Sequence, residues 1–197
     1  MKLKYELILA SNSPRRKQLL EERGFKFKIL SAEIDEKFSP DLSVDKNVQK
    51  LAHDKVSFVL NRYSVKDKVI IGADTVVVYD NKILGKPVDI IEAKIYLTLL
   101  SDNWHVVFSG IAVYNPENKS IITDYEKTAV KFAKLNDEMV NFYIKNFQPM
   151  DKAGAYGIQD FGAFFVEKID GCFFNVVGLP LYRLFSILRA EKLFIFK

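Results

Sequence analysis

In Leu7-Ile8-Leu9-Ala10-Ser11-Asn12-Ser13-Pro14-Arg15-Arg16, an apolar run passes directly into the start of a charged helix. The apolar run predicts a buried strand, and the Ser13 hydroxyl before a proline is typical of a helix N-terminus. Such a terminus attracts anions, because its N–H groups are unpaired and carry the positive end of the helix dipole. Arg15 and Arg16 add two guanidinium groups that stay charged near neutral pH. We therefore predict a polyphosphate-binding site close to the N-terminus.

Strand-like and helix-like segments alternate along the rest of the chain, which predicts the α/β class. The expected helices are residues 14–23, 44–63, 90–100, 136–146 and 179–188. The expected strands are residues 7–10, 25–30, 68–79, 106–114, 121–132 and 164–169, with a hairpin closed by residues 83–87. No repeat or linker divides the 197 residues, so we predict one domain over 1–197, in which Gly85–Pro87 and the turn at Asn115 are candidate boundaries between two lobes.

Charge and composition argue against several classes of protein. The 29 Lys and Arg against 25 Asp and Glu give a net charge of +4, which suits an anionic small molecule but lacks the dense basic stripe of a nucleic-acid binder. One cysteine, Cys172, excludes an internal disulfide, and only two histidines argue against a His-rich metal site. A metal would then need oxygen ligands, as Mg²⁺ and Mn²⁺ do. Without a signal peptide or a bilayer-length apolar run, we expect a cytoplasmic protein with no membrane partner.

Asp74 is the second residue that points to chemistry. It follows Lys68–Ala73, a nearly continuous apolar strand. An acid at the end of such a strand is where metal ligands and general bases lie in open α/β sheets. The alternative is an aspartate that caps a turn, but a carboxylate buried among apolar neighbours is costly without a chemical role.

Three further charged residues are ambiguous when they are taken singly. Lys86 lies on the stiff turn Gly85–Pro87, Lys55 lies on a predicted helix, and Glu36 lies in an acidic turn. Residues of each kind are more often simply solvated. Together with the two arginines and Asp74, however, they form a set in which cations neutralise a triphosphate while carboxylates hold a divalent ion and orient water.

The block Asp151-Lys152-Ala153-Gly154-Ala155-Tyr156-Gly157-Ile158-Gln159 combines small residues with a polar end. Glycines let a backbone lie close to a ligand, and the Gln159 amide can read a base edge as both donor and acceptor. A tight structural turn with Tyr156 in the core explains the glycines equally well, but not the charged pair Asp151-Lys152. His105, within an expected strand, is predicted to be a hydrogen-bonded packing residue.

Six motifs in register resemble the Maf family of nucleoside triphosphate pyrophosphatases and span nearly the whole chain. They are LILASNSPRR (Leu7–Arg16), LAHDK (Leu51–Lys55), IGADTVV (Ile71–Val77), LGKP (Leu84–Pro87), DKAGAYGIQ (Asp151–Gln159) and NVVGLP (Asn175–Pro180). The resemblance implies a mixed α/β fold, with a twisted sheet in two lobes around a central cleft. It also implies kinship with the house-cleaning inosine-triphosphate pyrophosphatases and makes a homodimer an open alternative to a monomer.

The resemblance further implies hydrolysis of a nucleoside triphosphate to the monophosphate and pyrophosphate, with a divalent cation such as Mg²⁺ or Mn²⁺. It makes Asp74 the proton acceptor that activates water for attack at the α-phosphorus. It assigns the metal to Glu36 and Asp74. It assigns substrate binding to Ser13, Arg15, Arg16, Lys55, Thr75, Lys86 and Gln159.

The choice of substrate depends on three of these positions. Arg15, Thr75 and Gln159 resemble the branch of the family that takes dTTP and UTP. The branch that prefers 7-methyl-GTP carries tryptophan at the position of Arg15 and lacks the Asp151–Gln159 pattern. We therefore predict a dTTP/UTP pyrophosphatase. The alternatives are a 7-methyl-GTP pyrophosphatase and a nucleotide-binding regulator of septum formation, a process associated with the family. One departure from the family pattern is Asp160, which follows Gln159 where glycine is common.

Overall fold

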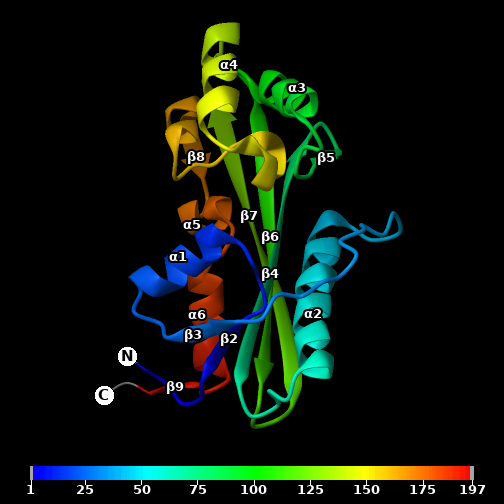
Figure 1. Cartoon of the computed structure of the whole chain (residues 1–197), viewed down its shortest axis with the longest axis vertical. Coiled ribbons are helices and arrows are strands. Elements are labelled where there is room, and N and C mark those ends of the chain that lie inside the picture. The colour runs from blue at the N-terminus through cyan, green and yellow to red at the C-terminus, as the bar shows by residue number, and fades with distance from the viewer. Residues whose placement is uncertain (1, 196–197) are drawn as a thin grey trace. The chain divides into compact units, whose positions relative to one another are not determined.

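The protein is of the α/β class (Figure 1), and the computed structural model describes residues 2–195. Its contacts divide the chain into two compact units. The first comprises Met1–Asp74, Ser109–Glu126 and Gly178–Lys197, and the second comprises Thr75–Phe108 and Lys127–Val177. Three of the four divisions fall inside long strands, β4 (Val69–Tyr79), β6 (Trp104–Asn115) and β7 (Ser120–Phe132). The fourth falls directly after α5 (Phe173–Val177), and none falls at the turns around Gly85–Pro87 and Asn115.

One mixed sheet contains most of the strands. Besides the long strands it includes β2 (Leu7–Leu9), β3 (Phe27–Ile29), β5 (Lys82–Leu84) and β8 (Val166–Asp170). The strand order is β3-β2-β4-β6-β7-β8, with β5 paired to β4. Strand β2 is parallel to β3 and β4, whereas β5 is antiparallel to β4 and β8 is antiparallel to β7. A separate antiparallel pair joins β1 (Lys2–Leu3) to β9 (Phe194–Ile195). The mixed α/β fold class is therefore confirmed.

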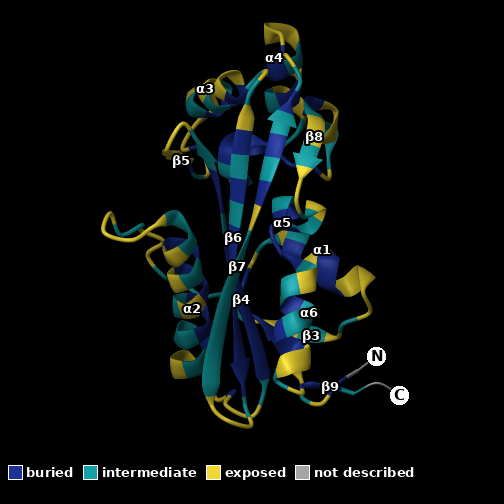
Figure 2. Ribbon diagram, turned by 180° about the vertical axis from the view of Figure 1, so that it is seen from behind, coloured by how far each residue is buried: buried dark blue, intermediate teal, exposed yellow. Residues whose placement is uncertain are grey.

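In the first unit, helices cover both faces of the sheet. Helix α2 (Val44–Arg62) lies on one face, and α1 (Pro14–Glu22) and α6 (Leu181–Ala190) lie on the other (Figure 1). Figure 2 shows mostly buried strands between them, with the start of β7 intermediate, and exposed residues along the outer sides of the helices. Ala52, Val56 and Val59 of α2 pack on Ile8 and Ile70 of the sheet in one fully buried cluster. Burial of such side chains contributes about 1.5–3 kcal/mol each, so this packing holds α2 and its polar side chains in place.

Close approach of α2 to the sheet depends on Gly110 in β6. A Cβ atom at this position would lie 2.2 Å from the Val48 carbonyl oxygen of α2. We expect Gly110→Ala to lower the free energy of unfolding by about 3 kcal/mol or more, because the backbone of α2 must move away from the sheet. Urea denaturation measures this loss. Gly85→Ala is the matched control, since a Cβ there would meet nothing within 4 Å. Equal stabilities of the two variants would contradict the expectation.

The second unit contains helices α3 (Ile90–Leu100), α4 (Asp137–Asn146) and α5 (Phe173–Val177) and three 3-10 turns, Pro149–Asp151, Ala153–Ala155 and Phe161–Phe165. Helix α3 packs against α4 and against the first two turns. His105 is buried here, with its Nε2 atom 2.8 Å from the Tyr156 hydroxyl and its ring edge-on to Phe132. Burial lowers the pKa of His105 to about 4, so the ring is neutral at pH 7. The predicted packing role of His105 is confirmed.

The five predicted helices all form, each within two residues of its predicted ends. Two predictions need correction. Asp74 lies inside the continuous strand β4 and not at a strand end. Phe164 and Phe165 belong to a 3-10 turn rather than to the strand that follows, because the Asp160 side chain caps that turn through the Gly162 N–H. The short helix α5 and the β1–β9 pair were not predicted, since two-residue and five-residue elements carry too little periodicity. None of the helices within residues 2–195 is long and apolar enough to cross a membrane.

Candidate active site

Arg16 is fixed at the N-terminus of α1 by its own helix start. The Ser13 hydroxyl accepts a hydrogen bond from the Arg16 N–H at 3.5 Å and caps the helix, with proline at the first helical position. The guanidinium group of Arg16 is buried. It donates from Nε to the Gly178 carbonyl at 2.8 Å and from Nη1 to the Ser11 hydroxyl at 3.0 Å. The predicted cap is therefore confirmed, and Arg16 is a buried cation of fixed orientation.

Sequence reasoning missed Ser11 and Gly178 as the residues that hold Arg16. Both lie in motifs that were singled out, but nothing local indicated that a carbonyl 162 positions away would accept from Arg16. Gly178 has φ +118°, a conformation that side-chain-bearing residues rarely adopt. Its glycine therefore lets the chain turn so that its carbonyl meets the guanidinium group. The signal in the sequence that could have indicated this contact is the glycine before Leu179-Pro180.

Lys55 links two acidic residues from different parts of the first unit. Its Nζ atom lies 2.7 Å from Asp74 Oδ1 and 2.7 Å from Glu36 Oε1, and it also donates to the Ala73 carbonyl at 3.3 Å. Lys55 and Asp74 are both buried, whereas Glu36 is half exposed at its side chain. The alternative of Lys55 as a solvated helical lysine is therefore wrong, because the packing of α2 turns this side chain toward β4. The alternative of Asp74 as a turn cap is also wrong, since the residue lies within a strand.

The same charged groups influence Arg16. Burial lowers the pKa of the Arg16 guanidinium, and Arg15 lowers it further, whereas Asp74 and Glu36 raise it. Arg15, Arg16, Lys55, Glu36 and Asp74 are thus one electrostatic cluster, with three cations against two carboxylates. An excess of cations beside a helix N-terminus favours an anionic ligand.

The donor set fits a divalent cation that shares its coordination with a ligand. Within residues 2–195, no group of three His, Cys, Asp or Glu side chains is arranged to hold a metal. Glu36 and Asp74 nevertheless lie close together, because both contact the same Lys55 ammonium group. Mg²⁺ is typically bound by one or two carboxylates, with phosphate oxygens and water completing its six positions. Two carboxylates within this cationic cluster match this pattern, and a closed all-protein site does not.

Three predicted residues, Thr75, Lys86 and Gln159, belong to the second unit. Lys86 and Gln159 are exposed and Thr75 is half buried. Their segments are tied together, since the Gly154 N–H donates to the Gly85 carbonyl at 3.0 Å. Gly154 also lies so close to Val77 of β4 that a Cβ there would come within 2.9 Å of the valine side chain. The block that carries Gln159 therefore contacts both the turn that carries Lys86 and strand β4, which carries Thr75.

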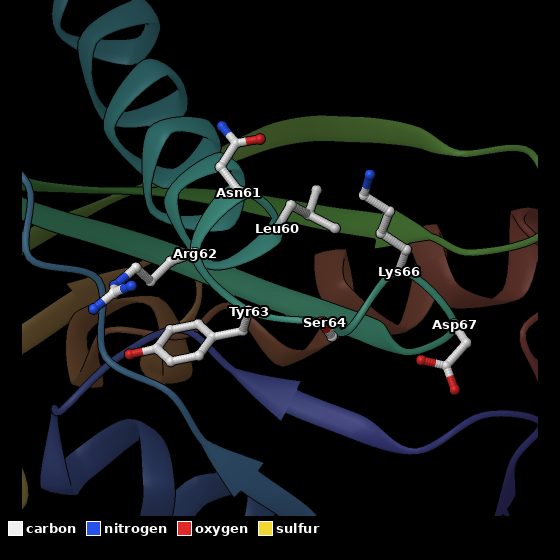
Figure 3. Close-up of a pocket in the computed structure, with 7 residues that line it drawn as sticks. All are labelled: Leu60, Asn61, Arg62, Tyr63, Ser64, Lys66 and Asp67. Carbon is white, nitrogen blue, oxygen red and sulfur yellow. The ribbon is translucent and has the colours of Figure 1, made fainter.

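A pocket of about 590 Å³ that contains none of these residues lies at the C-terminal end of α2 (Figure 3). Its lining residues are Leu60, Asn61, Arg62, Tyr63, Ser64, Lys66 and Asp67. None of the predicted site residues is among them. Its charged side chains are exposed, so they lack the fixed geometry that Arg16, Lys55 and Asp74 have.

The fold and the fixed cations define a class, an α/β protein with a buried lysine–aspartate pair and an arginine at a helix N-terminus, suited to phosphate-bearing ligands. The sequence model of one family, described as Maf-like protein, matches residues 6–191. The chain belongs to the Maf family.

Several curated relatives are similar over nearly their whole length. A dTTP/UTP pyrophosphatase of Caldicellulosiruptor saccharolyticus is 45% identical over 186 residues, which cover 93% of this chain and 94% of that protein. A dTTP/UTP pyrophosphatase of Alkaliphilus oremlandii is 48% identical, with 93% of this chain and 95% of that protein covered. A third protein of that name, from Geobacillus sp., is 49% identical, with 90% and 94% covered.

Proposed function

We propose that this protein hydrolyses dTTP and UTP to the nucleoside monophosphate and pyrophosphate. The observation that carries the proposal is the buried Asp74 carboxylate, oriented by Lys55 at 2.7 Å within a cluster of phosphate-binding cations. A protein that only binds nucleotides does not need a carboxylate of this kind. The names of its relatives, which cover more than nine-tenths of the chain, support the same substrate class.

In the proposed reaction, Asp74 acts as general base. A water molecule attacks the α-phosphorus, its proton passes to the Asp74 carboxylate, and the bond from the α-phosphorus to the bridging oxygen breaks to release pyrophosphate. Lys55 orients the base through its ammonium group, and Ala73 and Glu36 hold that group in turn. Positioning of this kind, together with charge neutralisation, supplies most of the catalysis in phosphoryl transfer.

Arg16 holds the phosphates in this proposal. We expect Arg16→Lys to raise KM for dTTP about tenfold and to lower kcat less, because a single ammonium nitrogen cannot donate to Gly178 and Ser11 and also present a fixed fork of N–H donors to the phosphates. Steady-state kinetics checks the result. Arg23→Lys, just beyond the other end of α1, is the control and should change KM by less than about twofold. An unchanged KM in Arg16→Lys would remove Arg16 from the phosphate site.

We assign base selection to Gln159 and Thr75 of the second unit and to Arg15 of the first unit. The Gln159 amide can donate to O4 and accept from N3–H of uracil or thymine, whereas cytosine presents the reverse pattern at these atoms. Arg15 and Thr75 complete the set of residues that we assign to pyrimidine recognition, and Lys86 adds a further phosphate contact. The exposed positions of Lys86 and Gln159 leave both side chains accessible to a ligand.

A substrate panel tests the proposed function. The protein is incubated with dTTP, UTP, CTP and 7-methyl-GTP in the presence of Mg²⁺ or Mn²⁺, and pyrophosphate release is measured. We expect release from dTTP and UTP, with CTP and 7-methyl-GTP turned over at least about tenfold more slowly. Preference for 7-methyl-GTP would favour a methylated-purine pyrophosphatase. Tight binding of dTTP without turnover would favour a regulator, and either result would overturn the proposal.

The divalent cation is also proposed, with Glu36 and Asp74 as its protein ligands. When bound it would neutralise charge on the phosphates. We expect EDTA to abolish activity and Mg²⁺ or Mn²⁺ to restore it. We also expect Glu36→Gln to raise the Mg²⁺ concentration for half-maximal activity about tenfold, because one anionic ligand is lost. Asp35→Asn, one residue away, is the control. Full activity in EDTA would contradict the metal proposal.

The cytoplasmic location and the homodimer both stay predictions. Light scattering would test the homodimer.

A further inference from the structure

The loop that carries Gln159 is closed on itself. The Asp160 N–H donates to the Gly157 carbonyl at 3.4 Å, and the Ala163 N–H donates to the Asp160 carbonyl at 2.9 Å. A Cβ on Gly162 would lie 2.4 Å from the Gly157 carbonyl oxygen, so the two glycine backbones are in direct contact. Gln159 is the exposed residue of this turn, between buried Ile158 and half-buried Asp160. Its position therefore depends on the backbone on either side and not on packing of its own side chain.

The Asp160 carboxylate holds the C-terminal side of this turn. Its Oδ1 atom accepts from the Gly162 N–H at 2.9 Å and from the Tyr143 hydroxyl at 3.0 Å. Its Oδ2 atom lies 3.5 Å from the Nζ of Lys152. Every one of these partners belongs to the second unit. Asp160 therefore links the turn both to itself and to helix α4, which carries Tyr143.

Tyr143 completes the clamp on the N-terminal side. Its hydroxyl accepts from the Gly157 N–H at 2.9 Å while it donates to Asp160. The tyrosine ring is fully buried and stacks on Phe147, so the hydroxyl has a fixed position. Burial, with the Asp160 charge in second place, raises the pKa of Tyr143, and the hydroxyl therefore keeps its proton for donation at neutral pH. One buried hydroxyl thus ties the residues two before and one after Gln159.

We propose that Asp160, acting through Tyr143 and Gly162, is a positioning residue that holds Gln159 in the orientation needed to read a pyrimidine base. The inference rests on the proposed function, in which the Gln159 amide contacts the base. A glutamine on a loose loop would lose backbone and side-chain freedom on binding, whereas the clamp removes most of the backbone part before the ligand arrives. Asp160 itself does not touch the substrate.

A purely structural role, as counter-ion of buried Lys152, accounts less well for Asp160. Lys152 already has Asp151 at 2.9 Å and donates to the Gln148 carbonyl. The Asp160 contact at 3.5 Å is the longer of its two ion pairs. By contrast, Oδ1 makes two hydrogen bonds of ordinary length inside the clamp. The geometry favours the turn as the main partner of this carboxylate.

A double-mutant cycle between Asp160 and Gln159 tests the inference. The ratio of kcat/KM for UTP to that for CTP is measured in Asp160→Ala, Gln159→Ala and the double variant. We expect Asp160→Ala to lower the ratio about fivefold to tenfold through KM, with kcat for UTP changed by less than about twofold. In the Gln159→Ala background the same substitution should change the ratio by less than about twofold, because there is no amide left to position.

Two further variants separate positioning from folding. Tyr143→Phe removes only the hydroxyl and should reproduce the lower ratio, and Asp160→Asn, which keeps an Oδ1 acceptor, should restore most of it. Asp170→Ala, an exposed acid at the end of β8, is the matched control. An equal fall of the ratio with and without Gln159 would overturn the inference, as would a fall in kcat alone. So would unfolding of Asp160→Ala together with an unchanged ratio in Tyr143→Phe.

The outcome can be distinguished from failure of the proposed function. If the wild-type protein releases no pyrophosphate from UTP or dTTP, the proposed function has failed. The same double-mutant cycle is then carried out on UTP affinity, measured by calorimetry in EDTA. The inference still expects Asp160→Ala to weaken UTP binding when Gln159 is present and to change it little in the Gln159→Ala background. Binding of UTP and CTP with equal affinity by the wild-type protein would overturn the inference there.

Discussion

Asp74→Asn is expected to lower kcat for dTTP and UTP about 1,000-fold while the fold stays intact. The amide cannot take the proton of the attacking water. It can still accept a hydrogen bond from Lys55, whose Nζ lies 2.7 Å from Oδ1 in the native protein, so the buried lysine keeps a partner. Pyrophosphate release measures the kinetic loss. Circular dichroism and urea denaturation measure the fold and its stability.

The matched control for Asp74→Asn is Asp54→Asn. Asp54 precedes Lys55 on α2 but pairs with Lys50 on the surface, at 2.6 Å. We expect kcat of this variant to stay within about twofold of the native value, because exposed pairs contribute little. If Asp74→Asn retained more than about a tenth of the native kcat, Asp74 would not be the general base.

Lys55→Met is expected to have the largest effect on stability, a loss of about 3–5 kcal/mol, together with a severe loss of activity. Methionine fills a similar volume, but the buried Asp74 carboxylate loses the ammonium group at 2.7 Å and becomes a charge without its partner. Glu36 also loses its partner at 2.7 Å, so the Glu36 and Asp74 carboxylates repel each other without a cation between them. Urea denaturation at pH 7 gives the change in the free energy of unfolding.

Lys50→Met supplies the control on the same helix, since its pair with Asp54 is exposed. Its stability should change by less than about 1 kcal/mol. The double variant Lys55→Met/Asp74→Asn should recover part of the lost stability, because no unpaired charge is then buried at Asp74. A Lys55→Met protein as stable as Lys50→Met would show that the buried pair contributes nothing to the fold.

Much of the fold could be predicted because its determinants are short-range. The alternation of long apolar strands with helices indicates the α/β class. Ser13, Asp89 and Asn136 cap α1, α3 and α4, and each of these helices starts within one residue of its predicted first residue. The exceptions are informative. Helix α6 starts two residues later than expected, after Pro180, and Phe164 and Phe165 are turned out of the predicted strand by a cap from Asp160.

For the candidate site, the sequence supplied candidate residues but not the contacts between them. Taken singly, Glu36 and Lys55 resemble solvated residues, and only Asp74 points to chemistry by itself; 19 positions separate Lys55 from Asp74. The resemblance to a family assigned these three residues to one site. No periodicity in the sequence could show that the Lys55 ammonium group contacts both carboxylates. Two contributors were missing: the Ser11 hydroxyl, five positions before Arg16, and the Gly178 carbonyl, 162 positions after it.

Local sequence thus determined the strand at Leu7–Leu9, the helix start at Ser13-Pro14 and the residue types available for chemistry, because caps, turns and periodicity depend on neighbours within a few positions. Only the tertiary structure decided which of those groups are buried and paired. The packing of α2 on the sheet places Lys55 against Asp74, and the packing of α4 places Tyr143 against the Gln159 turn. The physical reason is that burial and hydrogen bonding between distant segments set the charge environment of a group, and neither can be read from its neighbours in the chain.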